Sequence, residues 1–194
     1  MRASRRVLVA ALAYLSVFVS SSAAAQQSDR VIAERILGPQ WKQLSRRAGM
    51  IFAGTVLKTT MRTTASDGAV ARATPVVQLS FRVDEAIAGV ERGQILTIHE
   101  WAGAWSWSMH RPMRGGQHIL IFLYPPSHLG LTSTVGGPLG QVALDPSGKN
   151  VVERNPVVGA LNTSTAQPRP PVAPASVVQL IRAIRSARSE KEEE

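Results

Sequence analysis

Apolar and polar side chains alternate most regularly over residues 77–83, where every second residue is apolar. A period of two predicts a β-strand with one face in the protein core and the other in water. Residues 95–101 and 118–124 are two further apolar runs that resemble strands. Residues 50–57 are too apolar for a strand with one face in water, so they predict a central strand of a sheet.

Glycines and polar clusters separate these strands. Gly54 lies inside the first strand, where a glycine is costly unless the chain bends sharply or another backbone comes close. Residues 59–74 are polar and contain a Ser-Asp-Gly turn signal, which predicts a loop. Residues 139–144 and 151–152 flank an Asp-Pro-Ser-Gly turn and predict a closing hairpin. The chain therefore predicts about five strands.

Two stretches have the spacing of apolar side chains that is typical of amphipathic helices. The first lies within residues 26–48 and is broken at Gly38 and Pro39. The second lies within residues 174–194. Its apolar face is formed by Val177, Leu180, Ile181 and Ile184. This last helix is expected either to dock on the β-domain or to lie on a membrane surface.

The start of the chain has the three parts of a secretory signal peptide: a basic segment, an apolar run and small residues. The leader is predicted to cover residues 1–25, with cleavage between Ala25 and Gln26. A membrane anchor fits less well, because the apolar run is too short to cross about 30 Å of hydrocarbon. The mature protein is expected to be secreted or periplasmic, with no transmembrane segment.

Composition adds two constraints. The sequence has no cysteine, so an exported form would fold without disulfide bonds. The formal net charge of +9 is spread along the chain, which favours a solvated surface. The predicted organisation is a signal peptide (1–25), an N-terminal helical segment (26–48), a β-barrel (49–153), a Pro/Ser/Thr-rich linker (154–173), and a C-terminal helix with an acidic tail (174–194).

Three stretches resemble a known family. Residues 48–56, 81–89 and 116–123 read AGMIFAGTV, FRVDEAIAG and GQHILIFL. They look like the first, second and fourth strands of the tissue-inhibitor-of-metalloproteinase-like (netrin-type) OB domains. The resemblance covers residues 44–152. Together with the strand count and the leading helix, it implies a mainly β fold, a small closed OB-type Greek-key barrel with an N-terminal helical segment and a C-terminal helix.

One departure limits what the resemblance implies about activity. In the inhibitor family, a disulfide-tied cysteine at the mature amino terminus presents its amino and carbonyl groups to the zinc of the protease. Here the predicted first residue is Gln26, and no cysteine exists. The resemblance therefore implies a cysteine-free bacterial relative to which that mechanism does not carry over.

Few residues suggest catalysis or metal binding. The four histidines are His99, His110, His118 and His128. They lack helical ligand spacing and a cysteine partner, so no metal site and no cofactor are predicted. The chain has no G-x-S-x-G nucleophile motif, and Asp84 and Glu85 are expected to point to opposite faces of a strand. The sequence predicts a protein that is not an enzyme.

A tryptophan-rich stretch is the most unusual feature. Trp101, Trp105 and Trp107 lie close together, followed by Arg111 and Arg114. A buried tryptophan removes about 150–250 Å² from water, so exposing all three would be unfavourable. They either cap one end of the barrel or form a binding surface, since aromatic rings with guanidinium groups suit sugars, peptides or single-stranded nucleic acid.

These features predict an exported, non-enzymatic binding module of unknown ligand, with its partner surface at the Trp-rich loop, residues 101–114. The expected partner is an unidentified protein or a cell-envelope component, and export argues against a physiological nucleic-acid partner. The alternatives are a cell-envelope hydrolase or its accessory subunit, and a protease inhibitor that acts without zinc chelation by an N-terminal cysteine.

Overall fold

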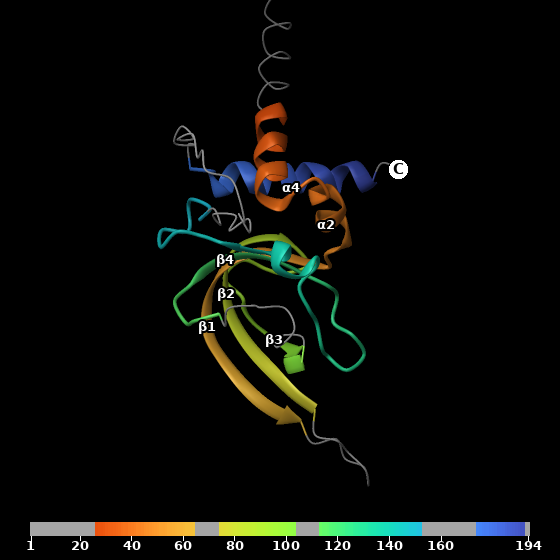
Figure 1. The fold of residues 1–194 in the computed structure, drawn as a ribbon, viewed down its shortest axis with the longest axis vertical. Helices are drawn as coiled ribbons and strands as arrows, with labels where there is room; N and C mark the ends of the chain where they lie inside the picture. The colour runs from red at the N-terminus through yellow and green to blue at the C-terminus, as the bar shows by residue number, and fades with distance from the viewer. Residues whose placement is uncertain (1–25, 65–73, 104–112, 153–173, 193–194) are drawn as a thin grey trace, which may run out of the picture.

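The fold is organised around one antiparallel sheet (Figure 1). The computed structural model describes residues 26–64, 74–103, 113–152 and 174–192. The strands are β1 (Met50–Thr64), β2 (Thr74–Ala88), β3 (Ile95–Trp101), β4 (His118–Leu123) and β5 (Gln141–Ala143), in the spatial order β3-β2-β1-β4-β5. The main helical segments are residues 26–37, α2 (Trp41–Arg47), the 3-10 helix η1 (Gly137–Gly140) and α4 (Val177–Glu192).

The sheet is open, so the predicted closed OB-type barrel is wrong. β3 and β5 are its edge strands, and no ladder joins them within the described ranges. The pattern of apolar residues predicts strands but not whether the edges meet, because closure depends on strand tilt and stagger. β5 has three residues, so it offers a short edge. The chain after β4 bridges β4 itself, pairing Leu123 with Thr134, and touches β3 at the isolated bridge between His99 and Leu131.

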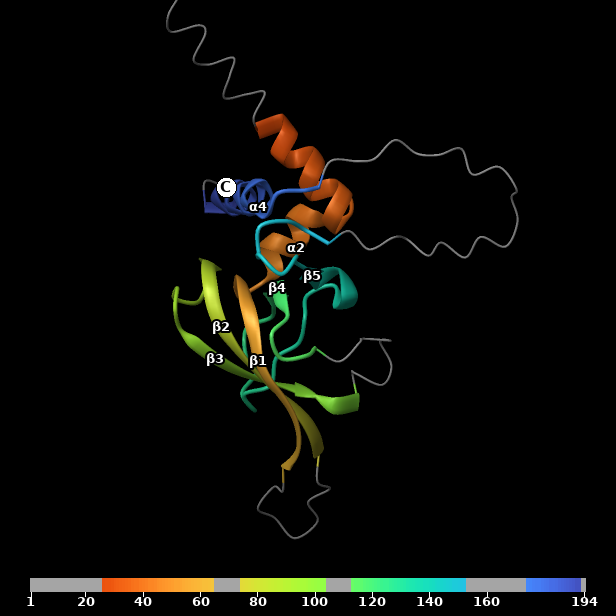
Figure 2. The same cartoon turned by 90° about the vertical axis from the view of Figure 1, so that its left-hand side faces the viewer.

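The hairpin formed by β1 and β2 is longer than predicted. Residues 59–74 were expected to form a loop because they are polar, yet β1 continues to Thr64 and β2 begins at Thr74. Thr59 pairs with Leu79 and Thr60 with Gln78. Threonine is β-branched and favours extended backbone even where the strand is exposed. The curved hairpin therefore projects well beyond the rest of the sheet (Figure 2).

Two hydrophobic clusters cover the two faces of the sheet. Ile51 and Ala53 of β1 belong to one cluster, whereas Phe52 and Val56 belong to the other. Residues of β4 divide between the clusters in the same way. Because neighbouring side chains of a strand point to opposite faces, residues 51–56 of β1 and 119–123 of β4 are buried on both sides. This confirms the prediction that the apolar run at residues 50–57 is a central strand.

Helices lie at both ends of the chain, and they gather at the end of the sheet opposite the hairpin tip (Figures 1 and 2). Leu180 and Ile184 of α4 are fully buried in the cluster that contains Ile51. Arg188 donates to the carbonyl oxygens of Ser45 and Ala48, at 2.8 and 2.9 Å. These bonds satisfy carbonyl groups at the end of α2 that lack helical partners. α4 is therefore docked on the protein, as one of the two interpretations expected.

None of the helices in the described ranges has the length and apolar character needed to cross a bilayer.

Candidate functional site

A cleft of about 490 Å³ lies where α4 faces the sheet, and it is called the α4 cleft below. Strands β1, β2 and β4 supply one wall, the turn after β5 a second, and α4 a third. The lining combines apolar side chains and glycines with six charged or ionisable side chains. They are Ala53, Gly54, Asp84, Glu85, His118, Leu144, Gly148, Lys149, Val177, Val178, Ile181, Arg182 and Arg185.

A β-bulge places both carboxylates in this cleft. Gly54 pairs with Val83, but the preceding residue, Ala53, pairs with Glu85, which leaves Asp84 as an extra residue in β2. In a regular strand, Asp84 and Glu85 would point to opposite faces. With the bulge, both line the α4 cleft. The prediction that the two groups point apart is therefore wrong.

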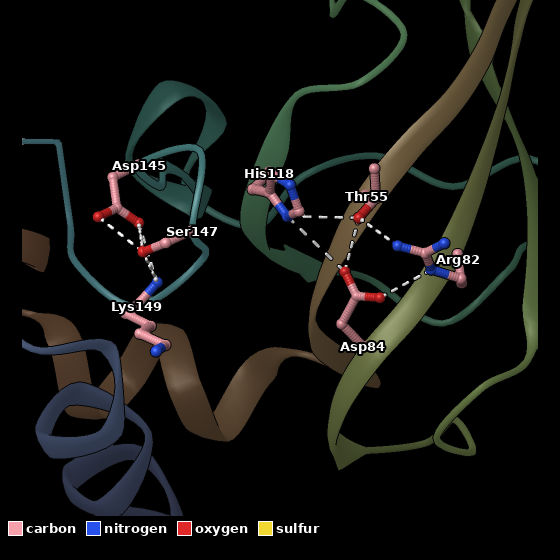
Figure 3. Close-up of polar contacts among 7 residues, drawn as sticks. All are labelled: Thr55, Arg82, Asp84, His118, Asp145, Ser147 and Lys149. Atoms are coloured by element: carbon pink, nitrogen blue, oxygen red, sulfur yellow. Dashed lines mark hydrogen bonds and ion pairs between the residues drawn. The ribbon is translucent and has the colours of Figure 1, made fainter.

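Asp84 is the centre of a polar cluster that also contains Thr55, Arg82 and His118, called the Asp84 cluster (Figure 3). Thr55 Oγ1 donates to Asp84 Oδ2 at 2.7 Å, and Arg82 Nε donates to Asp84 Oδ1 at 2.9 Å. His118 Nδ1 lies 3.8 Å from Asp84 Oδ2. Burial raises the pKa of Asp84, but the Thr55 and Arg82 hydrogen bonds and the charges of Arg82 and His118 outweigh it, so the pKa is lowered.

The Asp84 cluster does not have the arrangement of a catalytic triad. The Thr55 hydroxyl donates its proton to Asp84. His118 Nδ1 lies 3.3 Å from the Thr55 hydroxyl oxygen. In a catalytic triad, the base receives the nucleophile's proton and the acid orients the base from its other nitrogen. Here Asp84 accepts the hydroxyl proton itself, so the cluster differs from a triad, and its hydrogen bonds join β1 to β2.

The turn after β5 is held by the carboxylate of Asp145. Asp145 accepts hydrogen bonds from the Lys149 amide at 2.9 Å, the Asn150 side chain at 2.9 Å and the Ser147 hydroxyl at 2.8 Å. Gly148 adopts a positive φ and lies against His118, to which a Cβ would come within 3.5 Å. Figure 3 shows His118 between this turn and Asp84. The turn thereby fixes the position of Lys149 at the cleft.

Folding depresses the pKa of Asp145 well below its ordinary value of 3.8, chiefly through the side-chain hydrogen bond from Asn150. The ionised carboxylate therefore stabilises the fold above the ordinary pKa, and this contribution is lost as the pH falls through the lowered pKa. Asp145→Asn should have a lower free energy of unfolding than the wild type at neutral pH. This difference between the two proteins should become smaller from about pH 4 downward. Urea unfolding of both proteins between about pH 7 and about pH 2 measures this.

The exposed Glu91→Gln is a suitable control, since the Glu91 side chain makes no ion pair within the described residues. It should leave the free energy of unfolding nearly unchanged across the same range. A deficit of Asp145→Asn that stays constant between about pH 4 and about pH 2 would contradict the assigned role of Asp145.

Three cationic side chains line the cleft. Arg185 is paired with Glu85 at 2.7 Å, and Arg182 is paired with Asp29 at 3.3 Å. The ammonium group of Lys149 makes no ion pair within the described ranges. Lys149 is therefore the cation lining the cleft whose side chain has no carboxylate partner among the described residues.

No protein-family model, no curated protein and no solved structure matches this chain. The resemblance to the netrin-type OB domains stays a prediction. Any functional conclusion therefore depends on the geometry of the site.

Of the residues predicted to form a partner surface, the two that the structure describes, Trp101 and Arg114, do not line the α4 cleft. Trp101 ends β3, with its ring against Gly103, and Arg114 is exposed in the segment before β4. Trp105, Trp107 and Arg111 lie outside the described residues. At the predicted cleavage site, Ala25 also lies outside the described residues, whereas Gln26 is exposed in the helix over residues 26–37.

The histidines are dispersed over the described part of the chain. His99 is in β3, His118 in the Asp84 cluster and His128 in an exposed turn, while His110 lies outside the described residues. Within the described ranges, no group of three or more His, Cys, Asp or Glu side chains could hold a metal ion.

Sequence reasoning missed the residues that line the cleft opposite the sheet. Lys149, Arg182 and Arg185 come from segments far from β2 in the chain. One local signal was present, because Asp145 followed by Ser147 and Asn150 is typical of a turn in which an aspartate caps backbone amides. That signal predicts the turn, but not that it faces α4.

Proposed function

We propose that this chain is an exported, non-enzymatic binding module whose ligand occupies the α4 cleft. The observation that carries the proposal is the cleft itself. Its volume of about 490 Å³ falls within the roughly 300–1,000 Å³ of small-ligand sites. Apolar walls with a few convergent polar groups are also typical of such sites, because the walls supply affinity and the polar groups orient the ligand.

Two further observations support the proposal. The Asp84 cluster lacks the nucleophile–base–acid order of a catalytic triad, which favours binding over that form of catalysis. The basic, apolar and small-residue pattern of residues 1–25 supports export.

The Trp-rich loop, residues 101–114, remains a second contact surface in this proposal. Trp101 is 52% exposed at the edge of the sheet. An exposed indole on an edge strand supplies apolar area together with a hydrogen-bond donor, which suits a protein or envelope partner. The α4 cleft and the Trp-rich loop would then serve different ligands.

Blocking the cleft tests the proposal. Val178 lines the cleft and is 61% exposed, so Val178→Trp should fill the mouth without disturbing the core. The uncharged fluorophore N-phenyl-1-naphthylamine is the probe. The wild-type protein should bind it saturably, and Val178→Trp should weaken binding by about tenfold or more, measured by fluorescence titration.

Val31→Trp is the matched control, because Val31 is 56% exposed and does not line the cleft. It should bind the fluorophore as the wild type does. Circular dichroism should show that both variants keep the wild-type fold. Failure of the wild type to bind, or equal binding by Val178→Trp, would overturn the proposal.

A further inference from the structure

The acidic groups of the α4 cleft already have cationic partners. Asp84 accepts hydrogen bonds from Thr55 and Arg82, at 2.7 and 2.9 Å. Glu85 accepts one from Arg185 at 2.7 Å. A ligand that enters the cleft therefore meets carboxylates whose charge is largely neutralised, and a cationic ligand would have to compete with guanidinium groups that are held in place.

The basic groups are not balanced in the same way. Arg182 and Arg185 are each paired with a carboxylate, Asp29 and Glu85. Within the described residues, the Lys149 side chain has no carboxylate partner. Its backbone amide is bound to Asp145 at 2.9 Å, so the residue is fixed while its side chain is available to a ligand. An anion near an ammonium group forms a charge-assisted hydrogen bond, which is stronger beside apolar walls than in water.

The remaining walls suit an apolar body. Leu144, Val177 and Ile181 are buried side chains that line the cleft, and Val178 at its mouth is exposed. Covering such surfaces yields roughly 25 cal/mol for each Å² of apolar area removed from water. The favourable ligand therefore carries apolar surface that faces α4 and the turn after β5.

We infer that the α4 cleft binds a small organic monoanion, with an apolar body against α4 and its carboxylate or similar group at Lys149. This inference rests on the proposed function, because it names the ligand class of the same cleft. A single negative charge fits the single unpaired cation. A second one would find no further unpaired cation among the described residues that line the cleft.

Two fluorophores that differ by one charged group test the inference. 1-Anilinonaphthalene-8-sulfonate is N-phenyl-1-naphthylamine with an added sulfonate. The wild-type protein should bind the sulfonate form about tenfold more tightly, since each factor of ten corresponds to about 1.4 kcal/mol, the scale of one charge-assisted bond. Lys149→Ala should remove that preference without changing the affinity for the uncharged probe.

Two further variants act as controls. Lys149→Arg should keep the preference, because it keeps the positive charge. Lys58→Ala should keep it too, since Lys58 is exposed on β1 and does not line the cleft. Loss of the preference in Lys58→Ala would assign the effect to general surface charge and overturn the inference.

The outcomes separate the inference from the proposed function. If neither fluorophore binds the wild type, both fall. If both bind equally well, the proposed function stands and the inference about charge falls.

Competition identifies the ligand class more closely. Decanoate should displace the sulfonate probe at lower concentration than decanol, which has the same chain without the charge. Displacement by an acetylated peptide with a free terminal carboxylate, but not by decanoate, would overturn the assignment to a small-molecule anion.

Discussion

Gly54→Ala is expected to lower the free energy of unfolding by about 3 kcal/mol, the upper part of the range for overpacking. A methyl group at Gly54 would run into the carbonyl oxygen of Arg82 in the neighbouring strand. Because the obstacle is backbone, it cannot rotate away. β1 and β2 would have to separate where they make their bulge. Urea denaturation of the wild type and the variant measures the loss.

Gly103→Ala is an informative control. A methyl group there would meet the ring of Trp101, which is half exposed and can swing aside. This variant should therefore lose much less stability than Gly54→Ala. Similar losses of unfolding free energy in the two variants would show that the close Arg82 backbone is not what makes a methyl group at Gly54 unfavourable.

Gly54 also shows how far sequence reasoning can go. A glycine inside an apolar strand predicted a sharp bend or a close backbone approach, and the close approach is present. The sequence did not predict the bulge that makes Asp84 an extra residue. A bulge is a mismatch between two strands, so it depends on the partner strand and leaves no periodic signal in its own.

The other predictions about the fold differ in the same way between features of one segment and features of several strands together. Local patterns predicted β-strands within Ile95–Trp101 and His118–Leu123 and a helix within Val177–Glu192, because periodic burial is a property of one segment. Whether the sheet closes is a property of all strands together, and there the prediction was wrong. The α4 cleft joins segments as distant as Asp84 and Arg185, which no local pattern relates.

Leu180→Ala is expected to cost about 2–5 kcal/mol of unfolding free energy, as large-to-small changes in a core do. Leu180 is fully buried among residues of the sheet and the N-terminal helices. The truncated side chain would leave a cavity at the centre of the α4 interface. Since α4 supplies one wall of the α4 cleft, binding of N-phenyl-1-naphthylamine should weaken together with stability.

Leu129→Ala makes the same chemical change at a position that is 71% exposed. It should alter stability by no more than about 0.5 kcal/mol, because a side chain in water leaves no cavity when shortened. Equal effects of the two substitutions would mean that α4 does not contribute its apolar face to the core. Lost stability in Leu180→Ala with unchanged fluorophore binding would show instead that the ligand site does not need α4, and the proposed cleft would then have to be abandoned.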